Sequence, residues 1–240
     1  MIAGFEFGCR APLHVRHERV PGRVGGSEPW RLLFASDLHL LRSRAHLASG
    51  LAAIAQAERV DAVLLGGDLV DRDDALPVLV AAVRALARSA PVFAVPGNHD
   101  ARRGLAAVRA AVQEGGGHWL PQHDVVLRAV LRRDLHLHAT AAPLADGALH
   151  VLVGHHPAAA AAGLSHGHDV AFAGHLHGGQ CVWWQRGTRL FPGAWFSPWT
   201  GLRFQLGSST LLVSRGVADT LPVRFRCPRE VLLCELGGAS

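Results

Sequence analysis

Five short polar clusters hold most of the side chains in this sequence that could do metal or acid–base chemistry. Each cluster directly follows an apolar run. They are Asp37-Leu38-His39, Gly67-Asp68-Leu69-Val70-Asp71, Gly97-Asn98-His99-Asp100, Gly154-His155-His156-Pro157 and Gly174-His175-Leu176-His177-Gly178-Gly179-Gln180. In open α/β sheets, sites form in the crevice at the carboxyl ends of the strands. We therefore expect the five clusters to converge on one site.

The donor types indicate a dinuclear metal centre. Asp, Asn and His form a mixed oxygen and nitrogen set, which suits Mn, Fe, Zn or Co rather than Ca or Cu(I). If Asp37-x-His39 and His175-x-His177 are extended, each pair points to one face and grips an ion. Seven donors are too many for one ion, whereas two ions about 3.5–4 Å apart that share a carboxylate would use them all. The flanking glycines would let the backbone turn sharply beside the ions.

Alternating apolar and helical patterns predict the elements that hold the first three clusters. Strands are expected at Arg31–Ser36, Asp61–Leu65 and Pro91–Val95, and helices at 43–59, about 74–89 with Asp73 or Asp74 as N-cap, and Ala101–Gln113. Three successive strand–loop–helix units are typical of an α/β fold with parallel strands.

After Gly115–Gly117 the pattern changes to short strands, which indicates a second sheet packed on the first. They are expected at Val125–Val130, Leu135–His138, His150–Val153, Val170–Ala173, Cys181–Trp184, Leu202–Gln205, Thr210–Ser214, Val223–Arg226 and Glu230–Leu236. Residues 1–29 form an N-terminal extension with an edge strand around Leu13–Val20. Because no long linker interrupts the chain, we expect one domain over residues 1–240.

Composition excludes several classes of protein. With 240 residues, 49% hydrophobic and 18% charged, the chain is neither collagen, coiled coil nor wholly disordered. No apolar run approaches the roughly 20 residues of a membrane span, and no secretory signal is evident. The four cysteines form no CxxC, which fits a reducing compartment. These features predict a cytoplasmic protein. The net charge of +5, carried by Arg without Lys, permits an anionic partner.

The clusters together resemble the pattern of the calcineurin-like metallophosphoesterase superfamily: D-x-H, G-D-x-x-D, G-N-H-[DE], H-x-P and G-H-x-H, over Arg31 to Leu236. The chain is most similar to a bacterial subgroup that shares Ser36–Leu40, Gly67–Asp71, Gly97–Asp100, Gly174–Gln180, Ser214-Arg215-Gly216, Pro222–Phe225 and Pro228-Arg229-Glu230. Some members of that subgroup cleave the pyrophosphate of UDP-2,3-diacylglucosamine. The resemblance implies a four-layer α/β/β/α sandwich of two packed mixed sheets flanked by helices.

The resemblance also implies a role for each site residue. Two divalent ions are expected, Mn first, with Fe, Zn or Co as alternatives. The first ion takes Asp37, His39, Asp68 and His177. Asp68 bridges to the second ion, which also takes Asn98, His155 and His175. His99 is a catalytic residue that protonates the leaving oxygen, and Asp71 orients it. The implied reaction is in-line attack of a metal-bridging hydroxide on a phosphodiester or pyrophosphate of a lipid- or nucleotide-linked substrate.

Other functions stay open at this point: a cyclic-nucleotide or nucleic-acid phosphodiesterase, a general phosphomonoesterase, or a metal-binding scaffold without activity. Scattered arginines disfavour nucleic acid as a partner, and the presence of every expected ligand disfavours a scaffold. Near the clusters, Arg42, Arg44, Arg102 and Arg103 could grip substrate phosphates or be solvated. The apolar run Ala158–Ala162 stands where the family leads us to expect a polar residue.

Four of the six tryptophans lie in the segment Trp183–Trp199. This segment either packs on the rim of the second sheet or forms a peripheral contact with the inner membrane, since Trp favours membrane interfaces. The histidines outside the ligand set are interpreted as surface or internally hydrogen-bonded residues. They are His14, His17, His46, His118, His123, His136, His138, His150, His156, His166 and His168.

Overall fold

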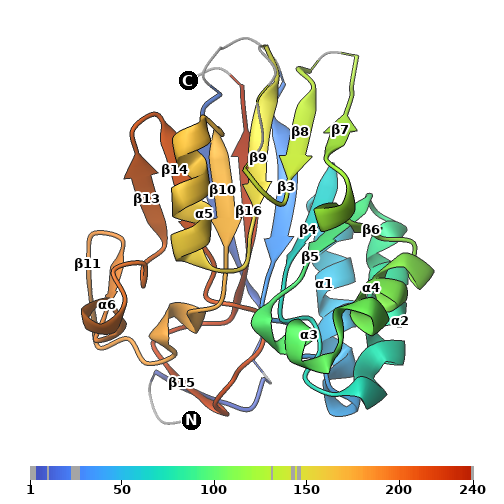
Figure 1. Cartoon of the computed structure of the whole chain (residues 1–240). Helices are drawn as coiled ribbons and strands as arrows, with labels where there is room; N and C mark the ends of the chain where they lie inside the picture. The colour runs from blue at the N-terminus through green and yellow to red at the C-terminus, as the bar shows by residue number, and fades with distance from the viewer. Residues whose placement is uncertain are drawn as a thin grey trace.

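Two six-stranded β-sheets pack face to face in the computed structural model, and helices cover the outer face of each (Figure 1). The structure describes residues 4–9, 11–22, 28–130, 132–141, 144 and 147–238. This arrangement is the four-layer α/β/β/α sandwich expected from the sequence.

The first sheet contains the three strands expected in the N-terminal half. Its members are β2 His14–Val20, β3 Trp30–Ala35, β4 Ala62–Gly66, β5 Val92–Val95, β6 His118–Trp119 and β16 Glu230–Leu236. Their order is β2-β16-β3-β4-β5-β6. Strands β3 to β6 run parallel as predicted, whereas β16 is antiparallel to β3. The predicted edge strand in the N-terminal extension is confirmed, because β2 lies at the sheet edge.

Helices α1 (Ala45–Ala57), α2 (Leu76–Ala87) and α4 (Leu105–Glu114) cover this sheet through apolar faces that include Leu51, Val83 and Val112. Neither Asp73 nor Asp74 caps α2, because both lie in a preceding 3₁₀ turn, Asp73–Ala75.

The single helix predicted over Ala101–Gln113 is wrong. The structure has two helices, α3 (Asn98–Arg103) and α4, separated by Gly104. Gly104 has a φ of +100°, a conformation that breaks the helical hydrogen-bond ladder and that glycine adopts without strain.

The second sheet is built from the C-terminal half, as expected, but two strands predicted for it lie elsewhere: Glu230–Leu236 joins the first sheet as β16, and the strand expected at Val223–Arg226 pairs outside both sheets. Its members are β7 Val125–Leu127, β8 Leu135–His138, β9 Leu149–Val153, β10 Val170–Ala173, β13 Arg203–Leu206 and β14 Ser209–Val213. Their order is β13-β14-β10-β9-β8-β7. Helix α5 (Pro157–Gly163) packs on the outer face over β9, β10 and β14.

Two short two-stranded sheets stand outside the large sheets. β11 (Trp184–Arg186) pairs with β12 (Arg189–Phe191), which leads into α6 (Gly193–Phe196). β1 (Phe5–Phe7) pairs with β15 (Val223–Phe225). The prediction of a second-sheet strand at Cys181–Trp184 is therefore wrong. Val182 N–H instead donates to the carbonyl of Phe225, which draws this segment toward β15.

The sheets meet in an apolar core where the rings of Phe34 and Phe172 stack 5.1 Å apart. Burying such side chains stabilises the sandwich by about 1.5–3 kcal/mol each. The arrows of β3 and β10 point toward the same end of the sandwich in Figure 1. The polar clusters follow these ends. None of the helices in the described part of the chain is long and apolar enough to span a bilayer.

Four of the histidines interpreted as separate surface or hydrogen-bonded residues pack on one another instead. They are His136, His138, His150 and His168, and the rings of neighbouring members lie 4.9–5.4 Å apart. The sequence does not reveal this group because strand pairing, not proximity along the chain, brings its members together.

Candidate dinuclear metal centre

The five polar clusters meet at the carboxyl ends of β3, β4, β5, β9 and β10. Backbone hydrogen bonds lock the first two loops together: Asp37 N–H donates to the Gly67 carbonyl and His39 N–H to the Asp68 carbonyl, both at 2.9 Å. The β10 loop joins them because His175 N–H donates to a carboxylate oxygen of Asp37 at 3.0 Å. The clusters therefore form one site, as expected.

The backbone around these side chains is not extended, contrary to the conformation predicted for Asp37-x-His39 and His175-x-His177. Asp37, His39, Asp68, His175 and His177 all have positive φ, between +39° and +69°. The left-handed region costs a non-glycine residue roughly 1–2 kcal/mol. Five such residues at one place indicate a geometry maintained for function. Each left-handed residue turns the chain so that its side chain points inward.

Two glycines let backbone approach the carboxylates closely. A Cβ on Gly97 would lie 2.1 Å from Oδ1 of Asp68, and one on Gly174 would lie 2.5 Å from Oδ2 of Asp37. Both distances are far below van der Waals contact. Any side chain at either position would displace a carboxylate of the site.

Three imidazoles present Nε2 to the centre because an acceptor holds Nδ1 of each. Nδ1–H of His39 donates to Oδ1 of Asp71 at 2.6 Å. Nδ1–H of His155 donates to the Gly66 carbonyl at 2.8 Å, and Nδ1–H of His177 donates to the Ala218 carbonyl at 3.2 Å. This tautomer leaves the Nε2 lone pairs free for a metal, with hydrogen-bonded partners that fix the rings as in known metal sites.

The facing atoms have the separations of ligands on shared ions. Nε2 of His39 lies 3.3 Å from Nε2 of His177, and Nε2 of His155 lies 3.1 Å from Oδ1 of Asn98. Two ligands held about 2.0–2.2 Å from one ion lie about 3–3.5 Å apart. The buried donors therefore fit divalent metal ions.

Asp68 has the position of a bridging carboxylate. Its Oδ2 lies 3.3 Å from Nε2 of His155 on one side and 3.9 Å from Nε2 of His39 on the other. Asp37 Oδ1 lies 3.7 Å from Nε2 of His177, on the His39 side. Two groups of donors thus share Asp68, one with Asp37, His39 and His177, the other with Asn98 and His155.

His175 lies at the edge of the donor group formed by Asp68, Asn98 and His155. Its ring lies 5.1 Å from that of His155, and a ring nitrogen lies within 4.8 Å of ligand nitrogens of His155 and His156. Burial and the charges of His156 and His155 lower the pKa of His175 to about 4, so its imidazole is neutral near pH 7. His156 itself is exposed.

The charges around the bridge are those of a cation site. Burial alone would raise the pKa of Asp68, but its contacts with His155 outweigh burial and hold that pKa well below its usual range. Burial would likewise raise the pKa of Asp71, and the hydrogen bond from His39 overrides it. Both carboxylates are therefore ionised at neutral pH inside a largely buried site.

Metal affinity is expected to fall as the pH drops. Burial lowers the pKa of His39 and of His155, but Asp71 and Asp68, respectively, outweigh it and raise each pKa above 6.5. Protons therefore stay on both imidazoles up to a higher pH than usual, and each Nε2 must lose its proton before it binds metal. Because His39 and His155 serve different ions, each ion competes with one of these protons, and its binding would weaken by up to about tenfold per pH unit below that pKa. Competition titration with a chromophoric chelator between about pH 8 and about pH 5 measures this; a constant affinity would contradict it.

His99 lies beside the donor groups and shares Asp71 with His39. Nδ1–H of His99 donates to Oδ1 of Asp71 at 3.0 Å, and its backbone N–H donates to Oδ1 of Asp68 at 2.7 Å. The side chain of His99 is partly exposed. With Nδ1 held by Asp71, Nε2 of His99 is available to a substrate.

Two further residues contact His177 or the carbonyl that orients it. Nη2 of the buried Arg224 donates to the Ala218 carbonyl at 2.8 Å, the acceptor that orients His177. Oγ1 of Thr220 lies 3.0 Å from Nε2 of His177. Sequence reasoning assigned neither a role, although Arg224 belongs to the quoted motif Pro222–Phe225. Arg44 also serves the loops, since it donates to the His39 carbonyl at 3.1 Å.

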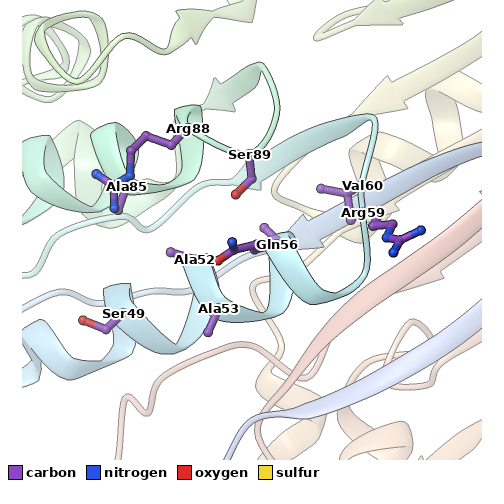
Figure 2. A pocket seen from close by; sticks show the side chains of 10 residues that line it. Ser49, Ala52, Ala53, Gln56, Arg59, Val60, Ala85, Arg88 and Ser89 are labelled. Atoms are coloured by element: carbon purple, nitrogen blue, oxygen red, sulfur yellow. The ribbon is translucent and has the colours of Figure 1, made fainter.

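A sizeable cavity also lies away from the strand ends. A cavity of about 770 Å³ lies between α1 and α2, and Figure 2 shows Ser49, Gln56, Arg88 and Ser89 among its lining residues. None of its lining residues is a carboxylate or an imidazole. The chemistry resides instead at the strand ends.

Comparisons with known proteins show the family and the fold. The sequence profile of the calcineurin-like phosphoesterases matches residues 31–179. The fold is similar to purple acid phosphatase PPD1 from yellow lupin (Lupinus luteus) seeds, with a TM-score of 0.51 and 12% identity over 85% of this chain and 47% of that one.

The match with two other solved structures covers more of the length of those proteins. A dimetal phosphatase from Danio rerio has a TM-score of 0.49 and 14% identity over 81% of this chain and 90% of that one. The protein TT1561 of Thermus thermophilus has a TM-score of 0.47 and 14% identity over 80% and 91%. No curated protein matches the sequence. The profile match spans more than half of the chain, including the first four polar clusters and the fifth as far as Gly179. This chain belongs to the calcineurin-like phosphoesterase family and is a metal-dependent phosphoesterase.

Proposed function

We propose that this enzyme cleaves a phosphodiester or pyrophosphate bond in a lipid- or nucleotide-linked substrate, such as UDP-2,3-diacylglucosamine. The observation that carries the proposal is an apolar cavity of about 470 Å³ that opens directly beside His155 and His156. A monoester would need no such space beyond the phosphate. An acyl chain or a base would use it.

In this proposal Asp37, His39, Asp68 and His177 hold one divalent ion, and Asp68, Asn98, His155 and His175 hold the other. The mixed carboxylate, amide and imidazole set favours Mn²⁺, with Fe, Zn or Co as alternatives. When bound, the two ions supply Lewis acidity and a nucleophile at neutral pH.

The chain's own contribution to bond cleavage comes from His99. Asp71 accepts the Nδ1–H of His99, which directs Nε2 toward the substrate. Nε2–H then donates its proton to the departing oxygen. Asp68 fixes the backbone of His99 through its Oδ1, so the general acid and the bridging carboxylate keep one relative position.

The Ala158–Ala162 run supports an apolar substrate. It belongs to α5, and three of its residues, Ala159, Ala160 and Ala162, line the cavity beside His155. The polar residue expected there from the family would be costly to bury against this surface. Alanine instead leaves both room and an apolar wall for an acyl chain.

Exposed aromatic side chains around β11 to α6 further support a lipid-linked substrate. Trp183, Trp195 and Phe196 are 65%, 67% and 87% exposed, whereas Trp199 packs against Phe204 at the sheet rim. Arg186 and Arg189 pair in register at the tip of the same hairpin. Helix α6 and β12 contact the 3₁₀ turn His177–Gly179, so this surface adjoins the site. Tryptophan with arginine suits an interface of anionic lipid.

Membrane contact through this hairpin makes a measurable prediction. In co-sedimentation with anionic vesicles at low salt, Trp183→Ser with Trp195→Ser is expected to weaken binding about tenfold or more, because two interfacial anchors are lost. Leu105→Ser, which removes an exposed leucine on α4, is the matched control and should bind as the parent does. Failure of the parent protein to bind these vesicles would overturn the membrane contact.

The substrate class is tested with a cavity-filling pair on one helix. Ala159 and Ala158 are both exposed on α5, but only Ala159 lines the cavity beside His155. Ala159→Phe should lower kcat/KM for a diacylated nucleotide-sugar pyrophosphate at least about tenfold and spare bis(p-nitrophenyl) phosphate, whereas Ala158→Phe should spare both. Equal effects of the two variants, or faster cleavage of cyclic nucleotides, DNA or monoesters than of the acylated substrate, would refute this assignment.

A further inference from the structure

A second group of histidines lies on the outer face of the second sheet, away from the dinuclear centre. His136 and His138 alternate along β8 with Leu135 and Leu137, which face the core between the sheets. His150 lies directly opposite His136 in the register of β8 and β9. The strand pairing therefore places three imidazoles on one patch of sheet surface.

The ring nitrogens in this patch converge. One nitrogen from each of His136, His138 and His150 lies within 4.8 Å of the others. Nε2 of His138 is 3.1 Å from Nδ1 of His150. Two imidazole nitrogens bound about 2.0–2.1 Å from a tetrahedral ion lie about 3.3 Å apart. The His138–His150 pair already has nearly that separation, and a bound ion would replace the hydrogen bond between the two rings.

We propose that His136, His138 and His150 form a separate mononuclear site for a borderline divalent transition ion such as Zn²⁺. An all-imidazole set favours Zn²⁺ over Mn²⁺, which prefers oxygen ligands. His136 is half-buried while His138 and His150 are buried, so the site opens to solvent on the His136 side. Three protein ligands leave one position there for water or a further ligand.

The surroundings keep the imidazoles ready to bind a cation. Burial and the neighbouring histidines lower the pKa of His136, and burial lowers that of His138, so both rings are neutral at pH 7. Oδ2 of Asp124 lies 3.2 Å from Nδ1 of His138, close enough for charge interaction but outside hydrogen-bond geometry. A carboxylate behind a ligating imidazole is the usual supporting partner at a metal.

The remaining neighbours leave the site accessible. His168 is fully buried and packs edge-on against His138 with ring centroids 5.1 Å apart, and it closes the inner side. The carboxylate of Asp169 accepts the backbone N–H of His150, which fixes β9 beside it. Arg128, whose charge acts on His136, is paired with Asp134 at 3.2 Å. A bound ion would tie β8 to β9 near the sheet edge.

Counting bound Zn²⁺ tests the site. Metal-stripped full-length protein is titrated with Zn²⁺, and bound metal is measured after gel filtration. His136→Ala is expected to bind one ion fewer per chain than the parent. Asp124→Asn should keep that ion but bind it about 10–100-fold more weakly. His123→Ala removes an exposed histidine next to Asp124 and should match the parent.

The proposal is judged by the difference in bound Zn²⁺ between the parent and His136→Ala, not by the total. A dinuclear centre that binds no metal would lower both totals equally, so its failure is distinguishable from the failure of this site. Equal Zn²⁺ content in the parent and His136→Ala would overturn the proposal. A misfolded variant would mimic loss of metal, so thermal unfolding of the metal-free proteins is compared first. Because Asp124 is largely exposed, Asp124→Asn tests the same site without a change in the sheet; parental affinity in that variant would also count against the site.

Discussion

Asp68→Ala is expected to remove metal from both halves of the dinuclear centre and to lower turnover by at least about a thousandfold. Oδ2 of Asp68 faces both His39 and His155, so neither group of donors is complete without it. The electrostatic contribution of bound ions to phosphoryl transfer is several kcal/mol, and about 4 kcal/mol corresponds to a thousandfold change in rate. Metal content and kcat of the purified variant are the measurements.

Asp61→Ala is the matched control for this substitution. Asp61 directly precedes β4, whereas Asp68 follows it, so the two carboxylates lie at opposite ends of the same strand. Asp61 accepts the backbone N–H of Arg31 and has no contact with the donor groups in the described structure. This control should keep metal and activity. An Asp68→Ala protein with two bound ions and parental turnover would refute the bridging role.

His99→Ala should spare the metals and slow only the cleavage of poor leaving groups. Loss of a general acid costs about 10²–10⁴ in rate when the departing oxygen needs a proton. A p-nitrophenolate leaves without a proton, so cleavage of p-nitrophenyl esters should be slowed least. His99 contacts the centre through Asp71, through the ring of His39 at 4.7 Å and through its backbone N–H, and the last of these survives in alanine.

The measurement is a series of aryl phosphodiesters of increasing leaving-group pKa. The rate of the variant relative to the parent should fall steadily along the series, while metal content stays at the parental value. A uniform loss across the series would show that His99 does not act as the acid. Loss of metal would show that it acts as a ligand.

Much of the fold and of the site could be predicted because the relevant signals are local in sequence. Asp37 and His39 follow a largely apolar strand, and so do Asp68 and His155, so carboxyl-end convergence alone places them together. The two-sheet arrangement was equally visible in the shift from helical to strand patterns after Gly117.

The rest depends on backbone conformation and on long-range pairing. The residue types alone do not predict that the backbones of Asp68 and His177 adopt the left-handed conformation. The carbonyls of Gly66 and Ala218 fix two imidazole tautomers from positions 89 and 41 residues away in sequence. The His136, His138 and His150 group arises from the register of β8 with β9, which a pattern of single residues does not specify.

The central claim is that two divalent ions at these residues drive phosphoester hydrolysis. Its most direct test is hydrolysis of bis(p-nitrophenyl) phosphate by metal-stripped protein, before and after refilling with Mn²⁺, with bound Mn²⁺ counted in the same samples. The claim predicts no turnover without metal, full recovery at two Mn²⁺ per chain, and no recovery in Asp68→Ala. Turnover that survives metal removal, or a protein that binds no Mn²⁺ at all, would contradict it.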